Sequence, residues 1–306
     1  MPSQISLTVP LSNGFYRMKR VLFEPFDPVK WLTIGFCAWL AQLGSGGRAG
    51  IHYNSRLQGS ILPNLQHAFE QARQYFSLHL LWMLPLAAIG LLMGLAIVAV
   101  ILWVSSRGQF MFVHCVALER AEVQRPWEEY RREAHSLFLF RLVISLAVLL
   151  LTAPLAGSFL FVLLPILPKY GAAITVIKVL MLVTLALLSM VFAVAGLILG
   201  KLTRDFVVPI QFVRRCSCME AWRILVGLIG GNTVEFLLYL LFQIVLWMAV
   251  GAALFALTLM TCCVAGCLFA VPYLGTVLLL PIESFQRAFS LHYLAQYGPD
   301  YSPVAP

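Results

Sequence analysis

The stretch VLMLVTLALLSMVFAVAGLIL, residues 179–199, decides the fold class of this chain. It is 21 residues long and carries no charged side chain. As a helix that rises about 1.5 Å per residue it would extend about 32 Å. The hydrocarbon core of a bilayer is about 30 Å thick. The stretch therefore predicts a transmembrane helix.

The rest of the chain has a similar composition. Of its 306 residues 61% are hydrophobic and 11% are charged, and the mean hydropathy is +0.88. This composition leaves too little polar surface to cover a soluble globule. The net charge of +8 comes from Lys and Arg that flank the apolar runs, and no nucleic-acid-binding signature is present. We therefore expect the lipid bilayer as the main partner and no nucleic acid.

Further apolar runs indicate further spans. Four more have about the 20 residues that a spanning helix needs, and they cover residues 80–104, 142–164, 236–259 and 262–281. The run that contains residues 179–199 extends over residues 172–199. A sixth run, residues 28–43, has helix signals at both ends: Asp27 as N-cap, Pro28 at the first position and Gly44 after the last. Its helix would reach only about 24 Å, so it either crosses or is re-entrant.

The distribution of Lys and Arg favours a crossing by residues 28–43. With that crossing, sixteen Lys and Arg lie on one side of the membrane and four on the other, Lys178 being counted on neither. Without it, seven positive charges would move to the wrong side. We therefore predict an all-α polytopic bundle of six transmembrane helices with both termini in the cytoplasm. Residues 1–306 would form one membrane domain, with residues 282–306 as a cytoplasmic tail.

Two cytoplasmic loops carry signals for amphipathic helices at the membrane surface, which we call the elbow helices. Residues 126–141 begin with a proline and have apolar side chains at helical spacing. Ser217 to Glu220 is a capping box that opens a second helix, which ends at Gly230-Gly231. Trp at head-group level and Arg toward anionic lipid predict contacts with lipid head groups or with a partner protein. The candidate contact residues are Arg131, Arg132, Arg214, Arg215, Trp127 and Trp222.

Polar groups inside the apolar runs would indicate a transport pathway. Lys178 is the charged candidate, and Gln243 adds polarity to the run at residues 236–259. Because residues 179–199 are long enough to span by themselves, Lys178 can also lie at the outer interface. Lys178 and Gln243 form the candidate intramembrane polar site.

Pairs of glycines predict close helix packing. Gly90 and Gly94 are four residues apart, and so are Gly196 and Gly200. Such pairs let helix backbones approach each other in membranes. They fit close packing within the bundle or in a homo-oligomer.

No enzyme signature is present. The chain has neither HExxH nor GxSxG. Its six His residues lack the spacing of metal ligands, and several of its seven Cys lie in apolar runs, which argues against a metal site, a cofactor or a disulfide framework. We expect a non-enzymatic scaffold or accessory subunit that contacts lipid or partner proteins through the elbow helices. The alternative is a permease for an apolar or amphipathic substrate.

Three stretches resemble an uncharacterised family of bacterial multi-pass membrane proteins, itself distantly similar to the membrane domain of some glycerophosphodiester phosphodiesterases. They are RMKRVLFEPFDPVKWLTIGFCAWLAQLG (residues 17–44), SRGQFMFVHCVALERAEVQRPWEEYRREAHSLFLFRL (residues 106–142) and RDFVVPIQFVRRCSCMEAWRIL (residues 204–225). The likeness covers roughly residues 14–290. Its motifs are arginine, tryptophan and proline marks and bring no catalytic residues. The resemblance implies a helical protein of the bacterial cytoplasmic (inner) membrane.

Overall fold

The computed structural model describes residues 6–43, 61–163, 176–261 and 264–302, and every regular element in these ranges is a helix. The all-α prediction is thereby confirmed for this part of the chain. The elements in chain order are α1 (Thr8–Phe23), α2 (Pro28–Gln42), α3 (Ile61–Leu118), α4 (Gln124–Glu129), α5 (Arg131–Leu163), α6 (Val176–Leu202), a π-helix (Thr203–Val207), α7 (Val208–Arg214), α8 (Cys218–Gly231), α9 (Thr233–Met260), α10 (Val264–Ala270), α11 (Pro272–Leu278), α12 (Leu280–Ala295) and a 3-10 helix (Pro299–Tyr301).

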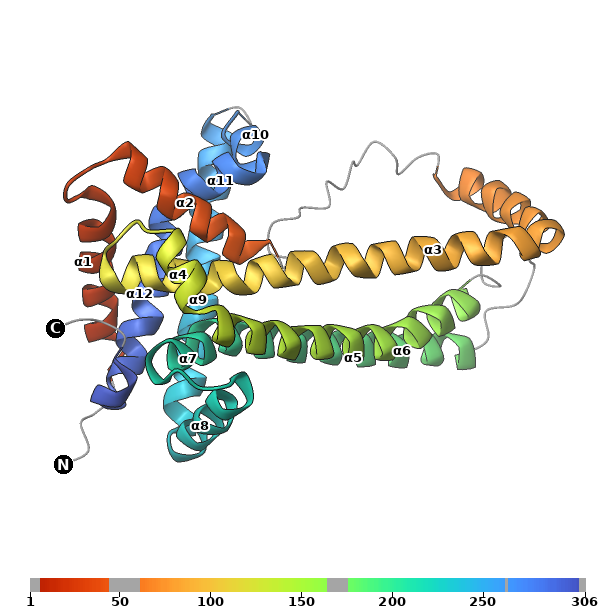
Figure 1. Ribbon diagram of the computed structural model, residues 1–306. Coiled ribbons are helices and arrows are strands. Elements are labelled where there is room, and N and C mark those ends of the chain that lie inside the picture. The colour runs from red at the N-terminus through yellow and green to blue at the C-terminus, as the bar shows by residue number, and fades with distance from the viewer. Residues whose placement is uncertain (1–5, 44–60, 164–175, 262–263, 303–306) are drawn as a thin grey trace.

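The helices form a head and an arm (Figure 1). The arm consists of α3 before residue 102, α5 after residue 141, and α6, which extend together to one side. The head consists of the remaining helices and contains both ends of the described chain. Buried hydrophobic side chains lie almost wholly in the head, whereas the large apolar side chains of the arm are mostly exposed.

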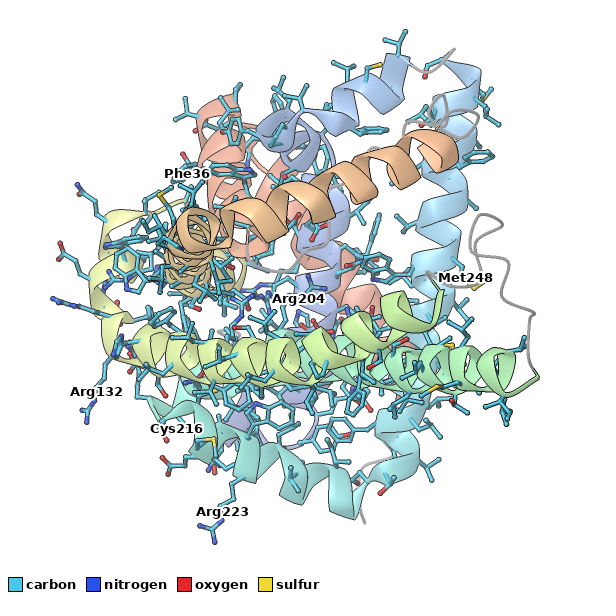
Figure 2. The ribbon with its side chains drawn as sticks, turned by 90° about the vertical axis from the view of Figure 1, so that its right-hand side faces the viewer. Phe36, Arg132, Arg204, Cys216, Arg223 and Met248 are labelled. Carbon is cyan, nitrogen blue, oxygen red and sulfur yellow. The ribbon has the colours of Figure 1, made fainter. Side chains whose placement is uncertain are left out.

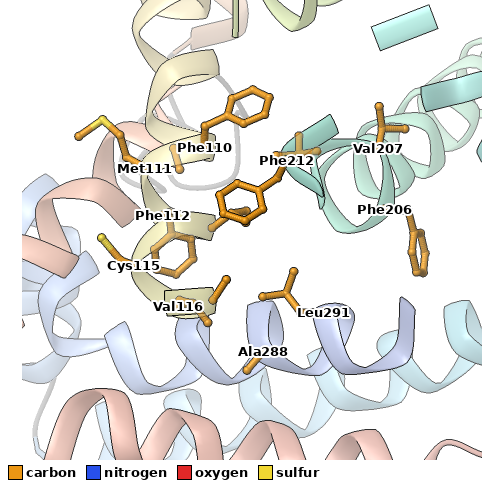
Figure 3. Packing of buried hydrophobic residues seen from close by; sticks show 14 of the residues in the cluster. Phe110, Met111, Phe112, Cys115, Val116, Phe206, Val207, Phe212, Ala288 and Leu291 are labelled. Carbon is orange, nitrogen blue, oxygen red and sulfur yellow. The ribbon is translucent and has the colours of Figure 1, made fainter. Parts of the chain in front are cut away.

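Helices α3, α7 and α12 meet at the centre of the head (Figure 3). Phe112 of α3, Phe212 of α7 and Leu291 of α12 belong to this cluster of buried side chains. Burial of such a cluster removes apolar surface from water, which stabilises the fold by about 25 cal/mol per Å² of buried surface. The head therefore has a core like that of a soluble domain.

Helix α1 packs along α12 and brings the two chain ends together. A Cβ at Gly14 would lie 3.0 Å from the backbone nitrogen of Phe289, so glycine allows this close approach. The backbone N–H of Ser6 donates to Oε1 of Gln296 at 2.9 Å, and Nε2 of Gln296 donates to the carbonyl oxygen of Ser6 at 3.0 Å. We call this reciprocal pair of hydrogen bonds the terminal clasp.

Four helical stretches are long and apolar enough to cross a membrane. They are Ala88–Leu118, Arg131–Leu155, Val179–Arg214 and Thr233–Met260. They overlap the spans predicted at residues 80–104, 142–164, 172–199 and 236–259, of which residues 164 and 172–175 lie outside the described ranges. Most of their large apolar side chains are exposed, and lipid is the environment in which such a surface is stable. The chain is therefore a membrane protein.

Helix α9 does not run along the arm. It stands vertically in Figures 1 and 2, whereas α3, α5 and α6 run horizontally in Figure 1. The four stretches are thus not packed as one parallel bundle. The glycine pairs are also open, because no described atom lies within 4 Å of a Cβ built at Gly90, Gly94, Gly196 or Gly200. Close packing at these glycines within the described chain is a wrong prediction, and the homo-oligomer stays a prediction.

Residues 28–43 are built differently from the predicted span. Helix α2 begins as the sequence indicates, with Pro28 at its first position and the Asp27 carboxylate accepting from the backbone N–H of Val29 at 2.9 Å. It packs into the head, however. A Cβ at Gly108 of α3 would lie 2.6 Å from the backbone nitrogen of Ala41, so the two helix backbones are in direct contact. One face of α2 is therefore covered by protein.

The last predicted span, residues 262–281, is also different. Residues 264–281 form α10, α11 and the start of α12. Pro272 and Pro281 account for the breaks, because each lacks a backbone N–H and lies in the first turn of a new helix. Six crossings therefore stay a prediction, with four candidate spans described.

The predicted cytoplasmic tail, residues 282–306, is largely part of the head. Helix α12 covers residues 280–295 and lies in the core. Its Phe289, Leu291 and Leu294 side chains are fully buried. The apolar-run pattern does not predict this core helix, because α12 has only 16 residues and includes polar ones such as Glu283, Gln286 and Arg287.

Candidate functional site

Arg215 is used inside the head. It ends α7 with a left-handed backbone conformation (φ 53°), which turns the chain back toward α4. Its guanidinium lies 4.0 Å from the ring centroid of Tyr130 and donates to the carboxylate of Glu129 and, at 3.2 Å, to its carbonyl oxygen. A further contact of 3.7 Å reaches Oε1 of Glu133. Arg215 therefore fastens α7 to the first elbow.

Arg214 fastens the C-terminal end of the chain. Its guanidinium lies 3.4 Å from Oδ2 of Asp300 and 4.5 Å from the ring centroid of Tyr301. Both candidate contact residues of this pair, Arg214 and Arg215, are thus engaged in internal contacts. Neither is presented to a partner as freely as the sequence suggests.

Arg131 and Arg132 have the opposite character. They are the first two residues of α5 and are exposed, and Figure 2 shows Arg132 pointing away from the ribbons. Within the described ranges neither has a hydrogen bond or an ion pair. A helix N-terminus favours negative rather than positive charge, so these two arginines do not stabilise the start of α5. They are the available part of the predicted contact set.

The first elbow itself is broken where one helix over residues 126–141 was predicted. Helix α4 ends at Glu129, Tyr130 leaves helical geometry with ψ 21°, and α5 begins at Arg131. The break places the Tyr130 ring in a stack with Phe212 at 4.8 Å and with Phe110 at 5.8 Å between centroids. Aromatic packing in the head core therefore overrides the helical pattern of this segment.

A groove of about 590 Å³ opens beside Arg131 and Arg132. It is lined by Trp103, Arg107, Glu128, Glu129, Arg131, Arg132 and His135. The guanidinium of Arg107 lies 4.6 Å from the Trp103 ring centroid and 4.7 Å from that of Trp127, while the two indole rings meet edge to face at 5.9 Å. We call this the elbow groove. Trp127, a predicted contact residue, therefore supports the groove by holding Arg107.

The second elbow, α8, forms as predicted. The Ser217 hydroxyl accepts from the backbone N–H of Glu220 at 3.3 Å, and the helix ends at Gly231. The Trp222 ring lies 5.9 Å from that of Phe140, and its buried indole nitrogen has no hydrogen-bond partner among the described residues, so the predicted contact of Trp222 with lipid head groups or a partner stays a prediction. Burial raises the pKa of the Cys218 thiol to about 12, so this thiol stays protonated at neutral pH. Cys218, Ala221 and Leu225 form the buried face of this elbow.

Gln243 belongs to a closed ring of polar side chains. Lys201 Nζ lies 2.8 Å from Oδ2 of Asp205 and donates to Oε1 of Gln243 at 3.3 Å. Gln243 Nε2 donates to the Tyr239 hydroxyl at 3.1 Å, and that hydroxyl donates to Asp205 at 3.0 Å. Each member has its partner, so the ring joins the end of α6 to α9. We call it the polar ring.

Two arginines extend the polar ring into the head. Arg204 Nε lies 3.8 Å from Oδ1 of Asp205, and Arg287 donates to the carbonyl oxygen of Arg204. Arg204, Asp205, Glu283 and Arg287 line a cavity of about 20 Å³, which is large enough for about one water molecule. Lys178 is not part of this arrangement, because it precedes Lys201 on the same helix by 23 residues, about 35 Å of helix. The two residues of the predicted intramembrane site are therefore not brought together.

Several residues of the polar ring and the elbow groove that were not predicted as site residues form pairs with a four-residue spacing in the sequence. Lys201 and Asp205 are four residues apart, as are Tyr239 and Gln243, and as are Trp103 and Arg107. Such spacing places side chains on one helix face. Within the described ranges no three His, Cys, Asp or Glu residues are placed to hold a metal ion.

The comparisons with known proteins give the chain a family and leave its activity open. No curated protein and no solved structure matches it. The distant likeness to the membrane domain of glycerophosphodiester phosphodiesterases therefore stays an expectation from the sequence. Residues 10–296, nearly the whole chain, match DUF7544, a family of unknown function, and the chain belongs to this family.

Proposed function

We propose that this protein is a non-enzymatic component of the bacterial inner membrane whose head gathers anionic lipid, or an acidic partner protein, at the first elbow. The observation that carries the proposal is the pair of exposed, unpaired arginines at the start of α5, Arg131 and Arg132. A basic residue near an anionic membrane surface contributes about 1 kcal/mol of attraction. These two residues would therefore contribute about 2 kcal/mol, and salt would weaken the attraction.

The distribution of basic residues supports a cytoplasmic location for the first elbow. The positive-inside rule places in the cytoplasm the segments that carry Arg120, Arg131, Arg132 and Arg223, all of which belong to the head. Helices α3 and α5 would then enter the membrane from the first elbow, and α9 is a further candidate span.

The permease is the weaker alternative. It needs a polar cavity near Gln243 and Lys178, yet Gln243 is engaged in the polar ring and Lys178 lies about 35 Å away along α6. No observation favours transport over lipid contact.

The test is the lipid composition around the protein in membrane discs cut directly from cells with a copolymer. We expect discs that contain the wild-type protein to hold a higher ratio of anionic to zwitterionic phospholipid than the bulk membrane. The R131E/R132E variant should lose this enrichment, and 0.5 M salt should reduce it. R120E/R223E is the matched control, because it makes the same change of charge at two exposed head residues outside the elbow groove. Enrichment that survives in R131E/R132E would overturn the proposal.

A further inference from the structure

The elbow groove lies at the inner end of two membrane-length apolar runs. The run on α3 ends at Val104, next to Trp103, and the run on α5 begins at residue 142. Arg141 Nη1 donates to the Ser105 hydroxyl at 3.2 Å, which fixes α3 and α5 at this level. The groove thus begins where the hydrocarbon-length part of each helix ends. A head group in the groove would have its acyl chains at the depth of the arm.

An exposed apolar stripe rises from the groove on each helix. On α3, Trp103 and Val100 continue the face of Arg107 at helical spacing, and Val100 is 60% exposed. On α5, Leu139 and Val143 continue the face of His135, and they are 47% and 66% exposed. We call these faces the apolar stripes. They offer a surface along which hydrocarbon chains can lie.

The charges of the groove favour an anion. Arg107, Arg131 and Arg132 contribute three positive charges. Of the two carboxylates, Glu129 is paired with Arg215, so Glu128 is the acid that remains to oppose them. A phosphodiester carries one negative charge, which the net positive charge of the groove attracts, and guanidinium groups bind its oxygens well.

Arg107 is preorganised for such a ligand. The two indole rings hold its guanidinium from two sides, so it loses little side-chain freedom when an anion binds. Its backbone is fixed as well, because a Cβ at the neighbouring Gly108 would lie 2.6 Å from the backbone of Ala41. The positive charge at the floor of the groove is therefore built into the packing of α2 against α3.

We propose that the elbow groove holds one anionic phospholipid of the inner leaflet, with its phosphate on Arg107, Arg131 and Arg132 and its acyl chains along the apolar stripes. This rests on the proposed function and goes beyond it, since it assigns a single lipid to a defined site. A protein partner is the less suitable occupant, because the groove continues directly into the surface that lipid covers. Free phosphate would leave the stripes unused.

The experiment is native mass spectrometry of the full-length protein in detergent, titrated with phosphatidylglycerol, phosphatidylcholine or glycerol phosphate. We expect one phosphatidylglycerol to bind at low concentration, at least tenfold more tightly than phosphatidylcholine. R107Q and R131E/R132E should each weaken this first binding step about tenfold or more. V143N, which places an amide on an apolar stripe, should weaken phosphatidylglycerol without creating binding of glycerol phosphate. R120E/R223E should bind as the wild type does.

The melting temperature of each variant shows whether a loss of lipid binding is due to unfolding. If R107Q does not fold, R131E/R132E still tests the site, because both side chains are exposed and unpaired. Equal binding of the two phospholipids, or of glycerol phosphate and phosphatidylglycerol, would overturn the site. Anionic lipid enrichment in the copolymer discs without a one-to-one lipid would overturn the site and leave the proposed function standing. Wild-type discs without anionic lipid enrichment, together with one bound phosphatidylglycerol in the mass spectra, would overturn the proposed function and leave the site standing.

Discussion

Replacement of Asp205 by Asn should destabilise the protein strongly, because Asp205 is the acid of the polar ring. Its side chain is 7% exposed, and it accepts from Tyr239 while facing Lys201 at 2.8 Å. Asn keeps the shape of the side chain but removes the charge. Lys201 would then lose the acid that it faces at the junction of α6 and α9.

The expected loss is about 3 kcal/mol. Removal of one partner from a buried ion pair costs about 3–5 kcal/mol, and the lower end applies because the Lys201 side chain is itself 17% exposed and can reach some solvent. One kcal/mol corresponds to about 2–4 °C in melting temperature for a domain of roughly this size. We therefore expect Asp205→Asn to melt roughly 6–12 °C below the wild type in detergent, followed by circular dichroism at 222 nm.

Two further variants separate the ion pair from a general effect of mutation. K201M/D205N removes both charges and should recover at least half of the lost melting temperature, because no uncompensated lysine remains. D300N removes the acid of an exposed pair with Arg214 and should change the stability by less than about 1 kcal/mol. A D205N protein that melts within 2 °C of the wild type, or a double variant no better than D205N, would refute this account of the polar ring.

Two other predictions concern the head. Gly108→Ala should lower the melting temperature by several degrees, because its Cβ would lie 2.6 Å from the Ala41 backbone and overpacking costs about 1–3 kcal/mol. Gly196→Ala is the control and should leave the melting temperature unchanged, because nothing lies within 4 Å of a Cβ at that position. Equal effects of the two substitutions would contradict the backbone contact between α2 and α3. Burial, with Arg17 as the smaller cause, lowers the pKa of His292 from 6.5 to about 4, so the folded state holds the neutral imidazole. Stability should fall as the pH drops from above 6.5 toward 4 and level off below that, because the unfolded chain gains the proton first. Thermal melts at pH 7.5, 5.5 and 4.0 should show a flatter profile for His292→Gln, and parallel profiles would rule out this residue as a source of the pH dependence.

Local signals were the part of the fold that the sequence could predict. The Asp27 cap, the Ser217 capping box and the helix end at Gly231 depend on residues a few positions apart, and the structure confirms each. Four of the five long apolar runs also lie, over their described residues, in single helices, namely α3, α5, α6 and α9. In these cases the interacting atoms belong to one segment, so the pattern contains the physical cause.

Apolar runs could not be divided into lipid-facing and protein-facing ones. Residues 28–42 are as apolar as a membrane segment, and the contact that draws α2 into the head lies at Gly108, far along the chain. Residues 262–281 have the composition of a span, but Pro272 and Pro281 end helices that a count of apolar residues treats as continuous.

The candidate site was predictable in the same uneven way. Arg131 and Arg132 were found from their position beside the membrane, whereas the engagement of Arg214 and Arg215 depends on Asp300 and Glu129, each 86 positions away. The polar ring joins two local pairs, Lys201 with Asp205 and Tyr239 with Gln243. Each pair is visible as a four-residue spacing, but the crossing of α6 and α9 that brings the two pairs together depends on tertiary structure and has no local signal.

The terminal clasp has a consequence for when the head can fold during synthesis. Ser6 and Gln296 are 290 positions apart, and α1 needs α12 as its packing surface. During synthesis α1 and the arm helices emerge before α12, so the arm helices are made before the head can close. A chain that stops short of α12 leaves the α1 surface and the centre of the core open to water. The head can therefore close only after α12 has been made, although α1 precedes α12 by more than 250 residues.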